Sequence, residues 1–147
     1  MITKTRFTLA LLRMLGKFDK GDYLSAYRIA EKMTSTLCPT NARVLLFKAY
    51  LSVLLENEDL ARCNLRAFYE VMDKKPSERS ISEDDNSWIL SFACYLRAVL
   101  AMEFDLKPVN GPSDWSSRLD SIDFSRVSEL TKRMFPPQHI PDMKQYM

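Results

Sequence analysis

The sequence has few of the residues that break helices or build chemical sites. Its 147 residues include three glycines, seven prolines, three cysteines and one histidine. The glycines are too far apart to form a glycine-rich phosphate loop. His139 lies between prolines in an expected tail, whereas a catalytic histidine needs a third group that holds it rigid. We therefore predict no catalytic residue, no cofactor and no enzymatic activity.

Metal-binding patterns are also missing. Cys38, Cys63 and Cys94 are widely separated and never form a C-x-x-C pair, so no zinc-ligand spacing exists. Their odd number is typical of free thiols in a reducing compartment, which favours a cytoplasmic location. Two acidic clusters precede expected helices and are interpreted as caps and dipole partners rather than metal ligands: Glu56, Glu58 and Asp59, and Glu83, Asp84 and Asp85.

Strong charge and long apolar runs are absent as well. The formal net charge of +2 is too small to indicate a nucleic-acid partner. Basic residues near the start, Arg6 and Arg13 among them, scatter around the expected helix and are interpreted as surface charge. The apolar stretches fall short of the roughly twenty residues that a membrane span needs. We expect neither a nucleic-acid partner nor a membrane partner.

Proline-free blocks with helical periodicity make up most of the chain, and strand-type alternation is hard to find. The sequence predicts an all-α fold of about six helices in a single domain over 1–135. The expected parts are hairpins 3–37 and 41–75, a polar loop 76–86, a helix 87–104, an irregular stretch 105–120, a helix 121–135 and a tail 136–147.

The third expected helix, "ARVLLFKAYLSVLLEN", is apolar on nearly every face, which predicts a helix covered on both sides. Thr40 or Asn41 is its expected N-cap. Trp88 lies on the apolar face of helix 87–104 and is expected in the core. The last helix is expected to be capped by Ser121 or Asp123.

The two hairpins align with each other. "GDYLSAYRIAEKM" precedes "CPTNA", and "NEDLARCNLRAFYEVM" precedes "KKPSE"; Ala26 and Ala61 take equivalent places 35 residues apart. Solenoids of helix-turn-helix repeats have a period of about 34 residues. The segment around Gly21, Tyr23 and Ala26 resembles the tetratricopeptide repeat over residues 7–75, with 84–104 opening a third unit. A helical bundle that mimics the repeat is the alternative, since Met14 and Met33 stand where the family has small residues.

The resemblance implies a concave face, lined by the first helix of each pair, that holds a segment of a partner protein. On this sequence the face comprises Thr8, Leu12, Leu15, Arg43, Phe47 and Tyr50. For Leu12, Leu15 and Phe47 the alternative is a place in the core. Trp115, in a polar stretch, either plugs the end of the helical stack or is an exposed interface anchor.

These features favour a non-enzymatic protein-binding module, an adaptor or chaperone that holds a peptide segment or helix of another protein. One alternative is a regulatory inhibitor of the immunity or antitoxin type. A second is a helical structural protein that associates with itself as a homodimer.

Overall fold

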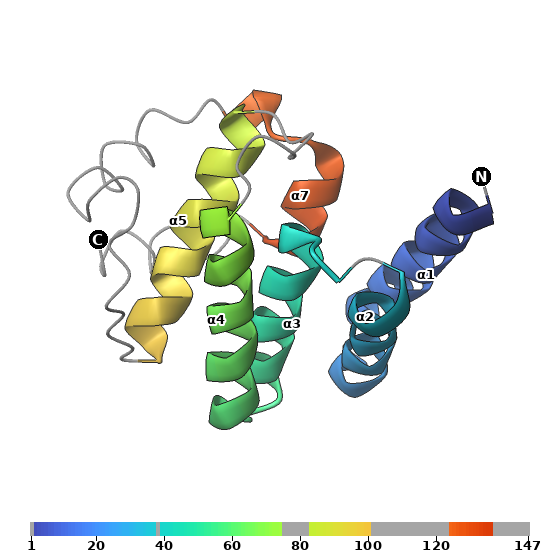
Figure 1. Ribbon diagram of the computed structural model, residues 1–147, viewed down its shortest axis with the longest axis horizontal. Coiled ribbons are helices and arrows are strands. Elements are labelled where there is room, and N and C mark those ends of the chain that lie inside the picture. The colour runs from blue at the N-terminus through green and yellow to red at the C-terminus, as the bar shows by residue number, and fades with distance from the viewer. Residues whose placement is uncertain (1, 38, 75–82, 101–123, 137–147) are drawn as a thin grey trace. The chain divides into compact units, whose positions relative to one another are not determined.

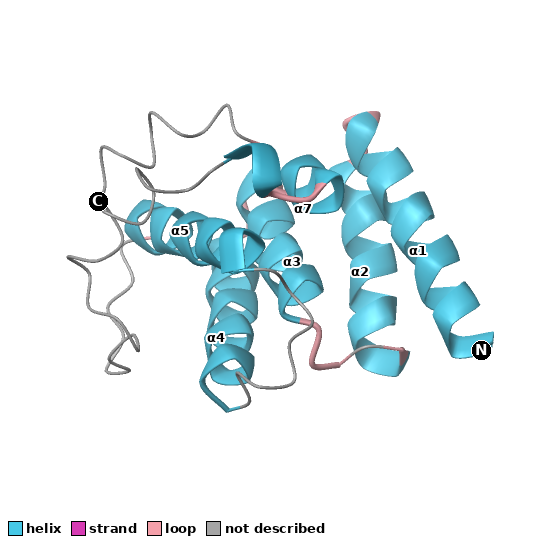
Figure 2. Ribbon diagram, turned by 90° about the horizontal axis from the view of Figure 1, so that it is seen from above, coloured by secondary structure: helices cyan, strands magenta, loops and turns pink. Residues whose placement is uncertain are grey.

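The computed structural model describes residues 2–37, 39–74, 83–100 and 124–136 (Figure 1). The helices are α1 (Ile2–Asp19), α2 (Tyr23–Thr36), α3 (Ala42–Leu54), α4 (Glu58–Lys74), α5 (Glu83–Val99) and α7 (Glu129–Met134), with a 3-10 turn, η2, at Phe124–Arg126. The described residues contain no strand (Figure 2). The predicted all-α class is therefore confirmed.

The chain divides into two compact units, Met1–Met72 and Asp73–Met147. The first unit holds the first hairpin (α1 and α2) and the second hairpin (α3 and α4). Within it α1 packs against α2, α2 packs against α3, and α4 runs beside α3 (Figures 1 and 2). The predicted single domain over 1–135 spans both units and stays a prediction.

The turns of the two hairpins are built in the same way. Gly21 and Glu56, 35 residues apart, have φ angles of 78° and 58°, in the left-handed region that ends many helices. The next residues, Asp22 and Asn57, cap the following helices by accepting hydrogen bonds from backbone N–H groups three residues on, both at 3.2 Å. The two turns thus repeat at the 35-residue spacing that the sequence alignment gave.

Backbone hydrogen bonds follow the same period. Asp22 N donates to Lys17 O at 3.0 Å, and Asn57 N donates to Ser52 O at 2.9 Å. Buried positions repeat too, since the following pairs are all buried: Leu11 and Leu46, Met14 and Ala49, Leu15 and Tyr50, Ala26 and Ala61, Ala30 and Leu65, Met33 and Phe68. Ala26 and Ala61 are fully buried.

The second hairpin supplies the most deeply buried helix of the first unit. Every residue of α3 is buried from Val44 to Ser52. Asn41 is the N-cap of α3 and accepts a hydrogen bond from Val44 N at 3.1 Å, as predicted. The prediction that this apolar helix is covered on more than one side is confirmed.

A polar network joins α2 to the second hairpin at the edge of this core. Lys48 Nζ lies 2.6 Å from Glu31 Oε2 and donates to Thr34 Oγ1 at 3.1 Å. Asn64 Nδ2 donates to Tyr27 Oη at 3.1 Å. This network could not be predicted from the sequence, because Lys48 stands alone within an apolar run.

In the second unit, α5 holds the end of the described chain by side-chain contacts. Asp85 accepts hydrogen bonds from Ser128 N and Ser128 Oγ, both at 2.7 Å, and from Thr131 Oγ1 at 3.1 Å. Trp88 Nε1 donates to Phe135 O at 3.0 Å, and Trp88 is buried as predicted. Asp85 therefore does more than complement the dipole of its own helix, because it fixes the N-terminus of α7.

Two predicted boundaries differ from the structure. Helix α5 begins at Glu83, four residues before the predicted start, because an acidic first turn suits a helix N-terminus. The predicted helix 121–135 is a 3-10 turn followed by α7. Its observed N-cap is Ser128, which has an extended backbone and accepts a hydrogen bond from Thr131 N. Residues 101–123, including the expected caps Ser121 and Asp123, lie outside the described residues.

Candidate functional site

The predicted concave face is divided between core and surface. Leu15, Phe47 and Tyr50 are buried, and the ring of Phe18 lies 5.1 Å from that of Phe47 and 6.0 Å from that of Tyr50. For Leu15 and Phe47 the structure agrees with the alternative of a place in the core.

The other three residues of the predicted face are more accessible. Thr8 and Leu12 are exposed, and Arg43 is half-buried. That any of the six residues binds a partner stays a prediction. Trp115 and His139 lie outside the described residues.

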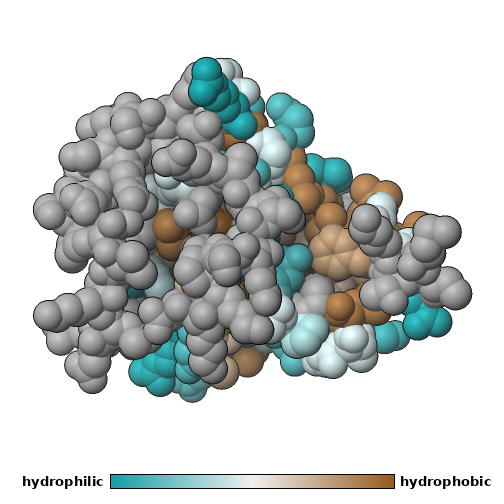
Figure 3. Space-filling view, turned by 45° about the horizontal axis from the view of Figure 1, so that its top comes forward, coloured by the Kyte–Doolittle hydropathy of each residue, from teal (hydrophilic) through white to brown (hydrophobic). Residues whose placement is uncertain are grey.

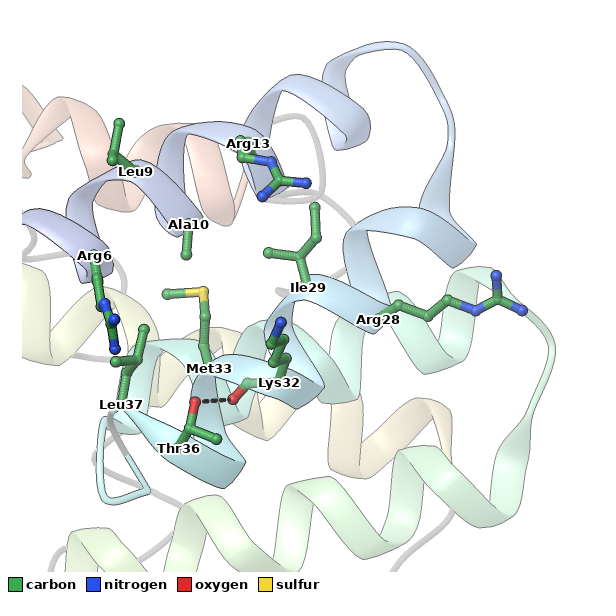
Figure 4. Close-up of a pocket in the computed structure, with 10 residues that line it drawn as sticks. All are labelled: Arg6, Leu9, Ala10, Arg13, Arg28, Ile29, Lys32, Met33, Thr36 and Leu37. Carbon is green, nitrogen blue, oxygen red and sulfur yellow. Dashed lines mark hydrogen bonds between the residues drawn. The ribbon is translucent and has the colours of Figure 1, made fainter.

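A groove runs along the first hairpin, between α1 and α2 (Figure 4), with a volume of about 770 Å³. Its lining combines apolar and cationic side chains, which are Arg6, Leu9, Ala10, Arg13, Arg28, Ile29, Lys32, Met33, Thr36 and Leu37. None of these lining residues is acidic. Figure 3 shows hydrophobic side chains, in brown, gathered beside hydrophilic ones on the side of the molecule where α1 and α2 lie.

The floor of the groove is apolar. Ile29 and Met33 point from α2 toward α1, and Ala10 points from α1 toward Met33 (Figure 4). Met33 is buried, whereas Ala10 and Ile29 are half-buried and so keep surface that a ligand can cover. Leu9, at the α1 edge, is 57% exposed. Apolar surface that a partner can cover therefore extends from the edge of the groove to its floor.

The cations stand around this floor. Arg6 and Arg13 are two helical turns apart on α1; Arg6 reaches toward Leu37 and Arg13 toward Ile29 (Figure 4). Arg28 and Lys32 are one turn apart on α2, and Arg28 extends away from α1 (Figure 4). Positive charges from both helices, Arg6 and Arg13 on α1 and Lys32 on α2, therefore border the apolar floor.

Acidic side chains lie near only some of these positive charges. Hydrogen bonds from Ser25 hold the pKa of Asp22 below its ordinary value, and the positive charges of Lys17 and Arg28 act in the same direction. Arg6, Arg13 and Lys32 form no ion pair with any acidic residue in the described part of the chain. These three charges are open to an anionic ligand.

The groove has binding groups but no reactive ones. It contains no histidine, cysteine, serine or carboxylate, and the one hydroxyl, that of Thr36, donates to Lys32 O at 2.7 Å. Within the described ranges, no three His, Cys, Asp or Glu side chains come together as metal ligands would. The arrangement suits noncovalent recognition of a molecule that is partly apolar and partly anionic.

A second hollow lies on the outer face of α4 and has about 440 Å³. It differs in charge, because Arg62 and Arg66 stand among Asp59 and Glu70, and Arg62 pairs with Glu58 at 3.0 Å. Its cysteine, Cys63, is exposed. With both signs of charge present and one pair already formed, this face is the weaker candidate for binding.

The cationic side chains of the groove could be found in the sequence, but the sequence did not reveal that those of α1 and α2 lie around one apolar floor. From the sequence alone, Arg6 and Arg13 are surface charges on one helix. Across the hairpin, however, Arg28 and Lys32 on α2 approach the same apolar strip. The available signal was the spacing of seven residues on α1 and four on α2, which places each pair on one side of its helix.

Comparison with other proteins adds no family to these observations. No protein-family model, curated protein or solved structure matches the chain. Among the described residues, no helix has both the length and the apolar character needed to cross a membrane.

Proposed function

We propose that the chain is a non-enzymatic protein-binding module of tetratricopeptide-like hairpins, an adaptor or chaperone that holds a segment of a partner protein. The observation that carries this proposal is the groove of the first hairpin, where exposed apolar surface is surrounded by cations without reactive groups. The 35-residue recurrence of turns, caps and buried positions supports the repeat architecture.

Two leucines of α1 allow a matched test. Leu9 and Leu12 are 57% and 55% exposed, but Leu9 lines the groove whereas Leu12 belongs to the predicted concave face. Leu9→Asp and Leu12→Asp introduce the same charge on the same helix at equal exposure. Both variants are expected to fold, which circular dichroism and thermal melting check.

The experiment compares the partners that wild type and the two variants retain after crosslinking in native cells, quantified by mass spectrometry. We expect a partner at near-stoichiometric amount that Leu12→Asp keeps and Leu9→Asp loses. Loss with Leu12→Asp alone would assign binding to the predicted concave face instead. If neither variant alters recovery of any protein, the binding proposal is wrong.

A further inference from the structure

The 35-residue period relates the groove to a surface of the second hairpin. Leu9, Arg13 and Ile29 correspond to Val44, Lys48 and Asn64, because α1 matches α3 and α2 matches α4. In each matched pair, the two residues stand at the same number of residues from the turn and the cap of their own hairpin. The second hairpin therefore shows what a face of this kind contacts inside the protein.

On the second hairpin this face is occupied by a helix, α2. Helix α2 packs against α3, and its Glu31 carboxylate lies 2.6 Å from Lys48 Nζ. One turn earlier on α2, Tyr27 Oη accepts a hydrogen bond from Asn64 Nδ2 at 3.1 Å. The docked helix thus presents an acidic side chain to the cation of α3 and an aromatic ring one turn away.

The equivalent positions of the first hairpin are open. Val44 is 1% exposed, whereas Leu9 is 57% exposed. Lys48 is 5% exposed, whereas Arg13 is exposed and has no acidic partner among the described residues. The structure therefore contains two copies of one face, and only the second has its helix in place.

We propose that the groove binds an α-helix of a partner protein that presents a carboxylate to Arg13, docked as α2 docks on the second hairpin. The inference rests on the proposed function and names the chemistry of its partner. Helices that lie with their apolar side in a hydrophobic groove are a common form of protein recognition. The groove side of α2, from Arg28 to Leu37, is about 14 Å long, which fits two to three turns of helix.

Differences between the two faces refine the sequence of this helix. Ile29 replaces the amide of Asn64, so an aliphatic or phenyl side chain fits there better than the tyrosine of α2. Arg13 replaces Lys48 and offers a planar fork that holds a carboxylate by two hydrogen bonds. Lys32 stands where the second hairpin has Ala67, which adds a cation for a second carboxylate.

The shape of the site favours a helix over a lipid surface. A membrane-binding face carries apolar side chains that protrude into the bilayer. Here Met33 is buried and Ala10 and Ile29 are half-buried, so most of the apolar floor is recessed between the cations. A rod-shaped ligand reaches such a floor, whereas a flat bilayer does not.

The test uses the full chain and a fluorescent copy of α2 as the probe. The peptide spans residues 22–37, carries Tyr27→Phe and is held helical by a lactam bridge on its outer face, because a free helix of this length is marginal in water. Fluorescence anisotropy measures its binding to wild type and to Arg13→Glu. A second peptide also carries Glu31→Lys.

We expect each single charge reversal, Arg13→Glu in the protein or Glu31→Lys in the peptide, to weaken binding about ten-fold or more. Combining the Arg13→Glu protein with the Glu31→Lys peptide should recover most of the affinity, since the ion pair forms again with the two charges exchanged. The matched control is Lys20→Glu, which changes net charge equally at an exposed position outside the groove and should weaken binding far less.

Other outcomes overturn the inference in distinguishable ways. Absence of peptide binding, together with a native partner that Leu9→Asp loses, would reject a helix docked in this way and leave the proposed function standing. Binding to phosphatidylserine vesicles that Leu9→Asp abolishes, without peptide binding, would assign the groove to a membrane. A dimer in light scattering that Arg13→Glu dissociates would make a second copy of the chain the occupant.

Discussion

The two hairpins of the first unit share a plan but differ in what surrounds them. Their turns, caps and crossing alanines repeat at 35 residues. Yet Leu12 is 55% exposed, whereas its counterpart Phe47 is fully buried. The same contrast holds for Arg13 and Lys48. Position within the 35-residue period determines the local backbone, and the neighbouring helix determines whether the side chain is buried or exposed.

This difference separates stability from binding. The second hairpin is covered by α2, so its residues hold the unit together. On the corresponding face of the first hairpin Leu9 and Arg13 are exposed, so these two side chains can serve a partner without weakening the core. Substitutions at matched positions should therefore have equal effects where the hairpins are alike and unequal effects where they differ.

The largest effect is expected where the hairpins are alike. Ala26→Glu and Ala61→Glu each force a charge between close helices at a fully buried site. An unpaired buried charge is strongly destabilising, and we expect each variant to lose at least about 4 kcal/mol of unfolding free energy. Urea denaturation followed by circular dichroism measures the loss, with Thr8→Glu on the exposed side of α1 as control. A mild effect at only one alanine would show that the two crossings differ.

A large and unequal effect is expected at the next matched pair. Phe47→Ala removes a buried ring that contacts Phe18 and should cost about 3–5 kcal/mol. Leu12→Ala, at the equivalent place on α1, should change stability by less than about 0.5 kcal/mol. Equal losses in urea denaturation would mean that Leu12 is covered in solution, and the contrast between the hairpins would fail.

Much of this fold could be predicted from the sequence because it depends on local signals. Apolar periodicity predicted the helices of the first unit, Asn41 was one of two expected caps, and the spacing of Ala26 and Ala61 predicted the 35-residue recurrence of buried positions. The boundary at Ser128 was missed, since that serine is fixed by Asp85, 43 residues away. Contacts between distant residues of this kind leave no periodic trace.

The candidate site was harder to predict for the same reason. The family resemblance directed attention to the first helix of each pair, whereas the groove also needs Arg28 and Lys32 of α2. Burial of Phe47 and Tyr50 depends on which helix covers α3. The apolar pattern of α3 itself does not reveal which helix that is. Sequence periodicity predicted which face of each helix is apolar, but it did not predict which of these faces another helix covers.

A smaller contrast is expected between the matched cations. Lys48→Ala removes the partner of Glu31 and Thr34 inside the unit and should cost about 1–3 kcal/mol. The loss stays moderate because the Glu31 side chain is 52% exposed and remains solvated. Arg13→Ala should leave the free energy of unfolding nearly unchanged, because Arg13 is exposed and forms no ion pair with an acidic side chain among the described residues. Thermal and urea unfolding measure both, and a costly Arg13→Ala would place that side chain in the core.

The smallest effect concerns Tyr27, whose hydroxyl links the hairpins through Asn64. Burial raises the pKa of Tyr27 above its ordinary value of 10.0, although the hydrogen bond from Asn64 acts in the opposite direction. Because the folded state keeps this proton longer than the unfolded state, the contribution of Tyr27 to stability is complete below pH 10.0 and declines as pH rises through the higher folded value. The difference in tyrosinate absorbance between wild type and Tyr27→Phe isolates its titration.

Asn64→Leu should move that titration to still higher pH, because it removes the hydrogen bond that favours the phenolate. A Tyr27 that titrates as a free tyrosine in both proteins would show that the link between α2 and α4 is open in solution, and the face of the second hairpin would then be no model for the groove.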